Sequence, residues 1–150
     1  MLHLTATAAI SNNRTVNAIK LYSGSSITLG AADGRTLTLT SGALLNAAGD
    51  NTLAQTNLAL GGTTGTFQVN TGSSLNVTGA ITGTGSFTKA LGGTMTLSAQ
   101  QFYSGTTNIL GGELKLAGGL NTIFPNTGVL NIGGGGTLNL KGNVQYVQAL

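Results

Sequence analysis

Short segments with alternating apolar residues recur along this chain, separated by corners that contain Gly, Ser or Gln. Between residues 83 and 116 the segments read SFTK, TMTL, TTNI and ELKL. Apolar residues two positions apart are typical of a β-strand with one buried face. The segments belong to two interleaved series. The first consists of Phe87, Ile109 and Ile132, at spacings of 22 and 23 residues, and the second of Leu97, Leu116 and Leu140, at spacings of 19 and 24 residues. Repeats of this period indicate a solenoid.

We therefore predict an all-β fold, a parallel β-helix (β-solenoid) of roughly seven turns of about 22 residues. Residues 1–150 form a single segment, in which the two series stack in the core and residues 1–15 are irregular or a cap. The composition agrees, with 25 glycines, 24 threonines, 14 asparagines and only 6% charged residues. Where the alternation lapses, we expect a loop or corner excursion at 46–56 and a looser stretch at 117–128, with a bend at Pro125. We also expect ladders of asparagine amides between turns, with Asn108 and Asn131 among the candidates.

Residues 83–118 resemble the autotransporter-associated β-strand repeat, found in passenger regions of Gram-negative surface proteins. The shared pattern is G-x-G-x-F-x-K, then G-T-M-x-L, an aromatic-Ser-Gly-x-T corner and G-G-x-L-x-L. Its residues here are Gly83, Gly85, Phe87, Lys89, Gly93, Thr94, Met95, Leu97, Phe102, Tyr103, Ser104, Gly105, Thr107, Gly111, Gly112, Leu114 and Leu116. Met95 stands where the family usually has Leu, and Gln100 and Gln101 where Asn is frequent. The similarity is best over 79–150.

The resemblance implies a right-handed parallel β-helix displayed outside the cell, with a shared scaffold rather than a shared activity. We therefore expect a non-enzymatic structural module, a stalk or adhesin segment on the surface of a Gram-negative-type bacterium. Flanking solenoid turns of a longer chain are the expected partners, and surface carbohydrate is a candidate ligand. No signal peptide or membrane span is evident in the sequence, and the strand-like VQYVQAL at the end suggests a piece of a longer protein.

Ionisable residues are too few and too scattered to indicate catalysis. A carbohydrate-active enzyme on this fold would need clustered carboxylates, whereas the acids are only Asp33, Asp50 and Glu113. His3 is the only histidine and there is no cysteine, so we expect no metal site and no cofactor. The six basic residues show no nucleic-acid footprint, and we expect Lys89 and Lys115 to lie on the surface near strand ends. The Thr-x-Thr segments are too irregular for an ice-binding array.

A fibre subunit is the alternative function. A solenoid has no closed end, so its terminal turns expose unpaired backbone groups that can pair with another copy. Such end-to-end contacts do not close and would extend into a filament. The residues we assign to this interface are Val144, Tyr146 and Val147 at one end and Val16, Ile19 and Leu21 at the other.

Overall fold

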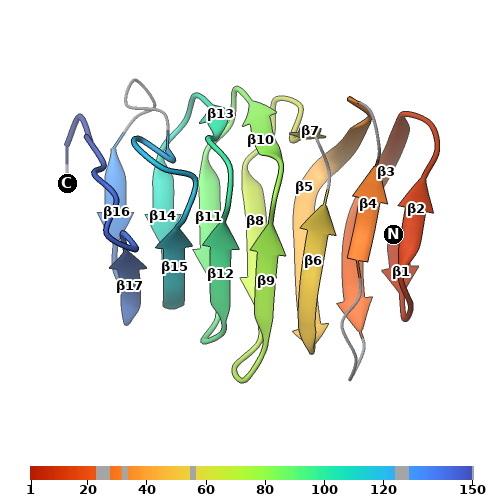
Figure 1. Ribbon diagram of the computed structural model, residues 1–150, viewed down its shortest axis with the longest axis horizontal. Coiled ribbons are helices and arrows are strands. Elements are labelled where there is room, and N and C mark those ends of the chain that lie inside the picture. The colour runs from red at the N-terminus through yellow and green to blue at the C-terminus, as the bar shows by residue number, and fades with distance from the viewer. Residues whose placement is uncertain (23–27, 32–33, 55–56, 124–128, 150) are drawn as a thin grey trace.

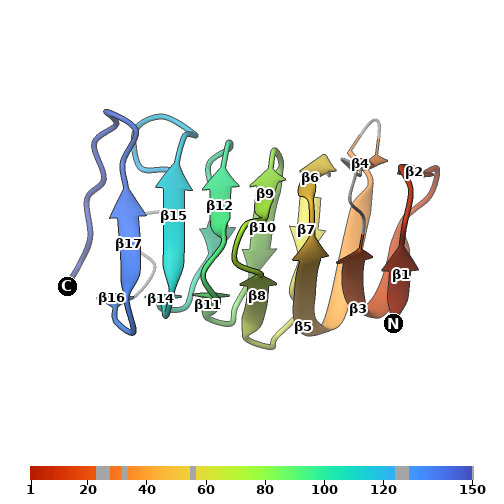
Figure 2. The same cartoon turned by 90° about the horizontal axis from the view of Figure 1, so that it is seen from below.

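The protein is a β-solenoid of parallel strands, with its two termini at opposite ends of the long axis (Figures 1 and 2). The computed structural model describes residues 1–22, 28–31, 34–54, 57–123 and 129–149, and within these ranges it contains no helix. About five of its turns have a strand on each of three sides. The expected seven turns are not confirmed, because the described residues after β13 (Phe102–Tyr103) form strands on two sides only.

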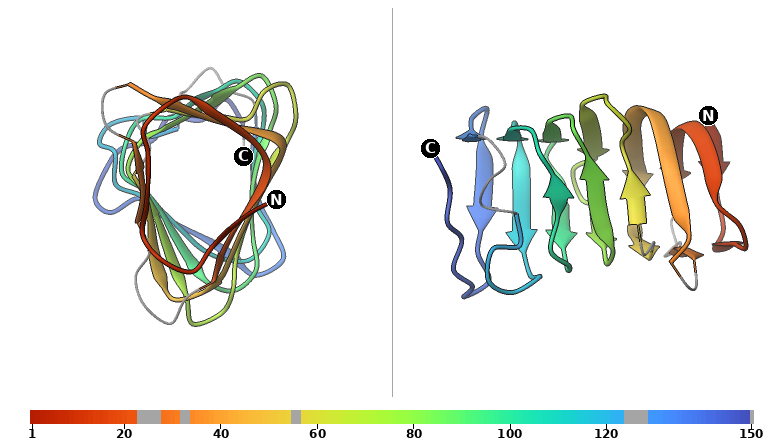
Figure 3. Two further views of the ribbon diagram at one scale, coloured as in Figure 1. Left: turned by 90° about the vertical axis from the view of Figure 1, so that its right-hand side faces the viewer. Right: turned by 90° about the horizontal axis from the view of Figure 1, so that it is seen from above.

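The cross-section has three sides (Figure 3). A ten-stranded sheet covers two of them, and a seven-stranded sheet covers the other. The first side consists of β1 (Leu2–Leu4), the second halves of β3 (Arg14–Tyr22) and β5 (Thr36–Ala48), β8 (Gly65–Val69), β11 (Phe87–Ala90), β14 (Thr107–Ile109) and β16 (Leu130–Ile132).

The second side is the seven-stranded sheet. It consists of β2 (Ala8–Ile10), β4 (Thr28–Ala31), β6 (Asp50–Ala54), β9 (Ser74–Val77), β12 (Thr94–Leu97), β15 (Gly112–Leu116) and β17 (Gly136–Asn139). The third side consists of the first halves of β3 and β5, with β7 (Asn57–Ala59), β10 (Ala80–Gly83) and β13 (Phe102–Tyr103). Because β1 and β2 pair with the coil that follows, residues 1–15 are part of the stack.

The core is a column of inward side chains in register from one coil to the next. On the second side, Met95 pairs with Leu75 on one neighbouring strand and with Leu114 on the other. These three side chains are buried. The residues next to them along each strand face outward, as the two-residue period of a strand requires. In the interior, Phe67 and Phe87 from the first side and Tyr103 from the third side form an aromatic stack. Neighbouring coils therefore supply nearly all of the packing.

The two predicted series do not share one pattern of pairing. Leu97 faces Leu116, and Leu140 follows the last residue of β17 and is 37% exposed. Ile109 faces Ile132, which is 43% exposed, whereas Phe87 faces Thr107. Lys89 takes the place opposite Ile109. The coil from β11 to β14 has 20 residues, from Phe87 to Thr107, instead of the 22 that the spacing from Phe87 to Ile109 predicted. A shift of two residues keeps the same face of the strand inward.

Lys89 is buried, which corrects the expectation that it lies on the surface. Its Nζ donates hydrogen bonds to the carbonyl oxygens of Ala90, Leu91 and Gly111, at 3.1, 2.7 and 2.9 Å. The first two belong to the corner between β11 and β12, and Gly111 belongs to the same corner of the next coil. Lys89 therefore links the backbones of two successive corners from inside the solenoid.

The loop or corner excursion expected at 46–56 is, in the described residues, only a tight corner at Gly49, because β5 continues to Ala48 and β6 covers Asp50–Ala54. Two asparagines at this corner are buried and fully engaged. The Asn46 amide donates to the carbonyl oxygens of Gly49 and Ser74, and the Asn51 amide donates to Ala48 O and to the Asn46 side chain. Buried amides thus satisfy the carbonyls of a tight corner, although in the sequence they look like loop residues.

Close stacking of coils explains part of the high glycine content. A Cβ on Gly85 would overlap the backbone carbonyl of Thr63 in the preceding coil. At Gly42 a Cβ would overlap the Thr64 carbonyl, and the backbone there also has a φ of +67°, which side chains disfavour. These corners can stack only because they carry no side chain.

Candidate functional site: the ends and outer faces of the solenoid

The N-terminal end of the solenoid opens into an apolar cavity of about 300 Å³. The residues that line it are Leu2, Leu4, Ala8, Ala9, Arg14, Thr15, Val16 and Leu37. Among the described strands, β1 and β2 each pair on one side only, so their outer edges carry free backbone donors and acceptors. The cavity is the mouth of the core at this end.

An extended segment, residues 143–149, crosses the C-terminal end. Its backbone accepts hydrogen bonds at Val144 O from Asn121 N and at Ala149 O from Leu130 N, both 3.0 Å long. Apolar side chains are exposed at this end, and we call this set the C-terminal patch: Ile132, Leu140, Val144, Tyr146 and Val147. The segment was predicted to be strand-like, but it is extended chain without a strand.

The predicted interface residues lie in different environments. Tyr146, the most exposed residue of the C-terminal patch, is 63% exposed, and Val16 lines the cavity at the N-terminal end. By contrast, Ile19 and Leu21 are buried, because they pair with Leu2 and Leu4 of β1. The N-terminal end face is therefore formed one strand further out than the sequence suggested.

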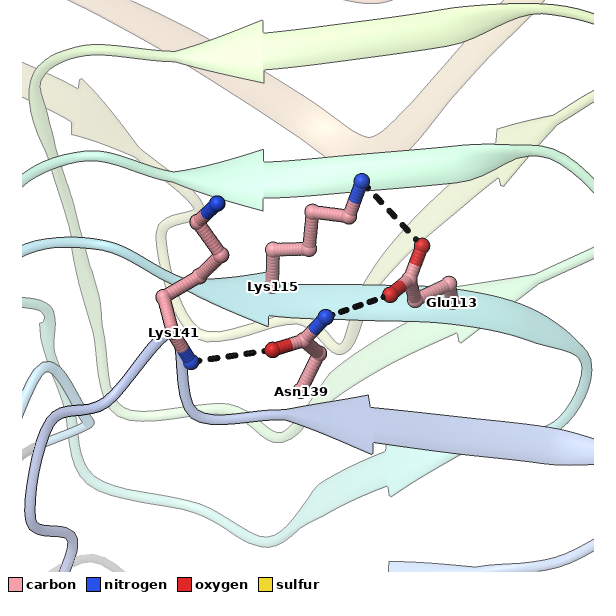
Figure 4. A network of polar contacts seen from close by, with 4 residues as sticks. All are labelled: Glu113, Lys115, Asn139 and Lys141. Atoms are coloured by element: carbon pink, nitrogen blue, oxygen red, sulfur yellow. Dashed lines mark hydrogen bonds and ion pairs between the residues drawn. The ribbon is translucent and has the colours of Figure 1, made fainter.

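The acidic residues serve local contacts on the outer surface. Asp50 accepts a hydrogen bond from the Ser74 hydroxyl at 2.7 Å. Glu113 accepts one from the Asn139 amide at 2.8 Å and lies 3.3 Å from Lys115 Nζ (Figure 4). The Asn139 hydrogen bond is the main reason why the pKa of Glu113 is lowered, and Lys115 adds to it. Asp33 lies outside the described residues.

The described residues contain no group of three His, Cys, Asp or Glu side chains that could hold a metal ion. His3 lies on β1 at the N-terminal end, so it is remote from Glu113 on β15.

Ladders of amides and hydroxyls run from coil to coil on the outside. The predicted asparagine pair is confirmed, since the Asn131 amide donates to Asn108 Oδ1 at 2.9 Å. On the third side, the Thr82 hydroxyl donates to Asn57 Oδ1 at 2.9 Å. On the second side the outward positions of one column differ in chemistry from strand to strand, in the order Thr52, Asn76, Thr96, Lys115 and Asn139. A regular hydroxyl lattice does not form there.

Two glutamines act at one corner of the solenoid in a way that the sequence did not reveal. Gln101 is buried, and its Oε1 accepts a hydrogen bond from Ile81 N at 2.7 Å. Gln145 accepts one from Ile123 N at 3.0 Å and donates back to Ile123 O at 2.7 Å. Each glutamine side chain thereby takes the place of a backbone carbonyl group and binds a backbone N–H of the preceding coil. The two glutamines are 44 positions apart, which is about two coils, and this spacing is the feature of the sequence that could have predicted their shared role.

None of the protein-family models, curated proteins and solved structures with which the chain was compared matches it. The similarity to the autotransporter-associated repeat rests on the motif residues and stays a prediction. A helix long and apolar enough to cross a membrane is absent from the described residues.

Proposed function

We propose that the chain is a non-enzymatic structural β-solenoid, a segment of a stalk or adhesin scaffold on the surface of a Gram-negative-type bacterium. The observation that carries this proposal is the parallel stacking of successive coils in two long sheets. A rod built in this way can be lengthened by adding coils at either end, because each coil contacts only its neighbours. The seven turns and the right-handed coil implied by the family resemblance belong to the same proposal.

Surface display can be tested directly. We expect the chain, fused behind a secretion signal and ahead of an outer-membrane translocator domain, to reach the outside of intact cells in a folded state. The absence of cysteine supports export, since no misplaced disulfide can form on the way. The measurement is labelling of whole cells with an antibody against an N-terminal epitope tag, followed by digestion with external protease. A chain that stays inaccessible while a known passenger is displayed would contradict the proposal.

A fibre subunit is a second candidate, favoured by the chemistry of the two ends. The C-terminal patch presents exposed apolar side chains, and the N-terminal end presents an apolar cavity. A second copy stacked end to end would cover both and would pair with the free edges of β17 and β2, the outermost strands of the seven-stranded sheet. This contact joins two different surfaces, so it repeats without closing.

For the fibre reading, we expect the purified chain to form filaments of uniform width as its concentration rises. Introducing Tyr146→Asp and Val147→Asp together should abolish them, because two carboxylates would have to be buried without partners. The matched control is Leu110→Asp, which places a charge on a residue that is 52% exposed at a lateral corner. Negative-stain electron microscopy over a concentration series is the measurement. Single short particles at every concentration would exclude the fibre and leave the first proposal standing.

A further inference from the structure

A groove of about 410 Å³ crosses the corner between the second and third sides. It spans successive coils, from the end of β6 past the β9–β10 corner to the β12–β13 corner. The residues that line it are Ala54, Thr78, Gly79, Ala80, Ala99, Gln100 and Phe102. Its volume is in the range of small-molecule sites in proteins.

Small residues create the groove. Three alanines and Gly79 provide lining from successive coils, and none of these residues has a side chain longer than a methyl group. Larger side chains at these positions would project from the surface and occupy the space between the coils. The groove is therefore a consequence of the residue sizes at this corner.

Phe102 forms one wall and presents its ring to solvent. Its neighbours Gln101 and Tyr103 are buried, and the alternation of the strand directs Phe102 outward, where it is 50% exposed. It pairs with Thr82 of β10, so its ring stands beside the coil that contributes Ala80. An exposed aromatic ring offers a flat apolar surface on which a ligand can stack.

Polar groups in the groove have unused hydrogen-bonding capacity. Gln100 donates from Nε2 to Asn121 O at 3.2 Å, which orients its carboxamide. Within the described residues, neither Gln100 Oε1 nor the Thr78 hydroxyl has a hydrogen-bond partner. The described lining residues include no Asp, Glu, Lys, Arg or His, so the groove favours a ligand that is uncharged and carries both donors and acceptors.

We propose that this groove binds a neutral carbohydrate, with one sugar ring stacked on Phe102 and its hydroxyl groups hydrogen-bonded to Gln100 and Thr78. A pyranose ring combines the two properties that the groove selects. It has a face of C–H groups for the aromatic ring, and it has hydroxyl groups at its edge that donate and accept hydrogen bonds. A purely apolar ligand would leave Gln100 Oε1 and the Thr78 hydroxyl without partners in the bound state.

The test is a titration of the full chain, observed by the amide resonances of the groove, with maltose, cellobiose, lactose and N,N′-diacetylchitobiose. We expect at least one of them to bind with a Kd of about 1 mM. Phe102→Ala should weaken that binding about tenfold or more, and Ala99→Leu should abolish it by filling the groove. Tyr22→Ala is the matched control, because Tyr22 is an aromatic residue that is 59% exposed on another side.

Thermal melting of each variant shows whether the fold is intact. The proposal is overturned if none of the four disaccharides binds, or if binding is unchanged in a folded Phe102→Ala variant. Preferential binding of digalacturonate, a charged disaccharide, would also overturn it. These results do not depend on whether the chain forms filaments or is displayed on a cell.

Discussion

Phe87→Ala is expected to lower the free energy of unfolding by about 3–5 kcal/mol. Phe87 is fully buried, and its ring lies between Phe67 and Tyr103 at centroid distances of 5.2 and 5.4 Å. The Phe67 and Phe87 rings meet at 70°, an edge-to-face arrangement that is favourable beyond the burial of area. Removing the ring leaves a cavity in a narrow core that only neighbouring coils can fill, so little relaxation is available.

Chemical denaturation of the purified variants measures this loss. Phe102→Ala is the control, because the same type of ring is removed from a half-exposed position in the same coil. The expected loss is about 0.5 kcal/mol or less. A cycle with Phe67→Ala should give a coupling of about 0.5–1.5 kcal/mol between the two rings. Equal losses for Phe87 and Phe102, or no coupling, would show that the aromatic stack does not stabilise the core.

Tyr103 is the third ring of the same aromatic stack, and its hydroxyl group is buried together with the ring. Its hydroxyl forms a hydrogen bond of 2.6 Å with the Thr107 hydroxyl, and burial raises the pKa of Tyr103 well above its usual value. The phenol therefore stays protonated over the range in which proteins are normally handled. The sequence placed Tyr103 in an aromatic corner together with Phe102, but only the pairing with β10 separates the buried ring from the exposed one.

The alternation of apolar residues was sufficient to predict the class of fold. Segments such as TMTL and ELKL are strands whose apolar residues point inward, and they pair in parallel, as a solenoid requires. Here the two-residue period within each segment and the spacing between segments both predict a parallel stack of strands. The second side follows this rule most closely, because Leu75, Met95 and Leu114 lie in register.

The register on the first side could not be predicted in the same way. This register depends on the number of residues in each corner, and that number differs from coil to coil. Phe87 pairs with Thr107, 20 positions later, whereas Ile109 pairs with Ile132, 23 positions later. A shift of two residues leaves the inward face unchanged, so the hydrophobic pattern does not report it. This is why Lys89 rather than Phe87 faces Ile109.

Buried polar residues were the other source of error. Asn46, Asn51 and Gln101 are of types that usually lie in loops or on the surface, yet each is engaged with backbone groups inside the solenoid. Tight corners turn carbonyl groups inward, and a side chain with N–H groups must reach them. A pattern of apolar residues does not predict the burial of such residues, because their inward positions depend on hydrogen-bond donors and not on apolar surface.

Lys89 is the most extreme of these residues, and Lys89→Met is expected to lower the free energy of unfolding by about 2–3 kcal/mol at neutral pH. Methionine has a similar volume but leaves three partly buried carbonyl oxygens without the Lys89 donor. One of them belongs to Leu91, whose φ of 66° lies in the left-handed region that a leucine rarely adopts. The hydrogen bond from Lys89 helps to hold this corner in its strained conformation.

The loss should also depend on pH. Burial lowers the pKa of Lys89 from 10.5 to about 8, so between these values the folded chain binds fewer protons at this site than the unfolded chain does. Stability contributed by this residue therefore rises with pH across that window, being smallest below about pH 8. The wild type should show this rise and Lys89→Met should lack it, which makes the difference between them larger toward pH 10.5.

Urea denaturation of both proteins at neutral pH and at about pH 10 is the measurement. Lys115→Met is the matched control, because Lys115 lies on the outer face of β15 and its charged group is hydrated. Its loss should be within about 1 kcal/mol at either pH. If Lys89→Met were as stable as Lys115→Met at both pH values, the buried ammonium would not be what holds the two corners together. A loss confined to Lys89 that grows with pH would identify it as the residue that fixes these coils from inside.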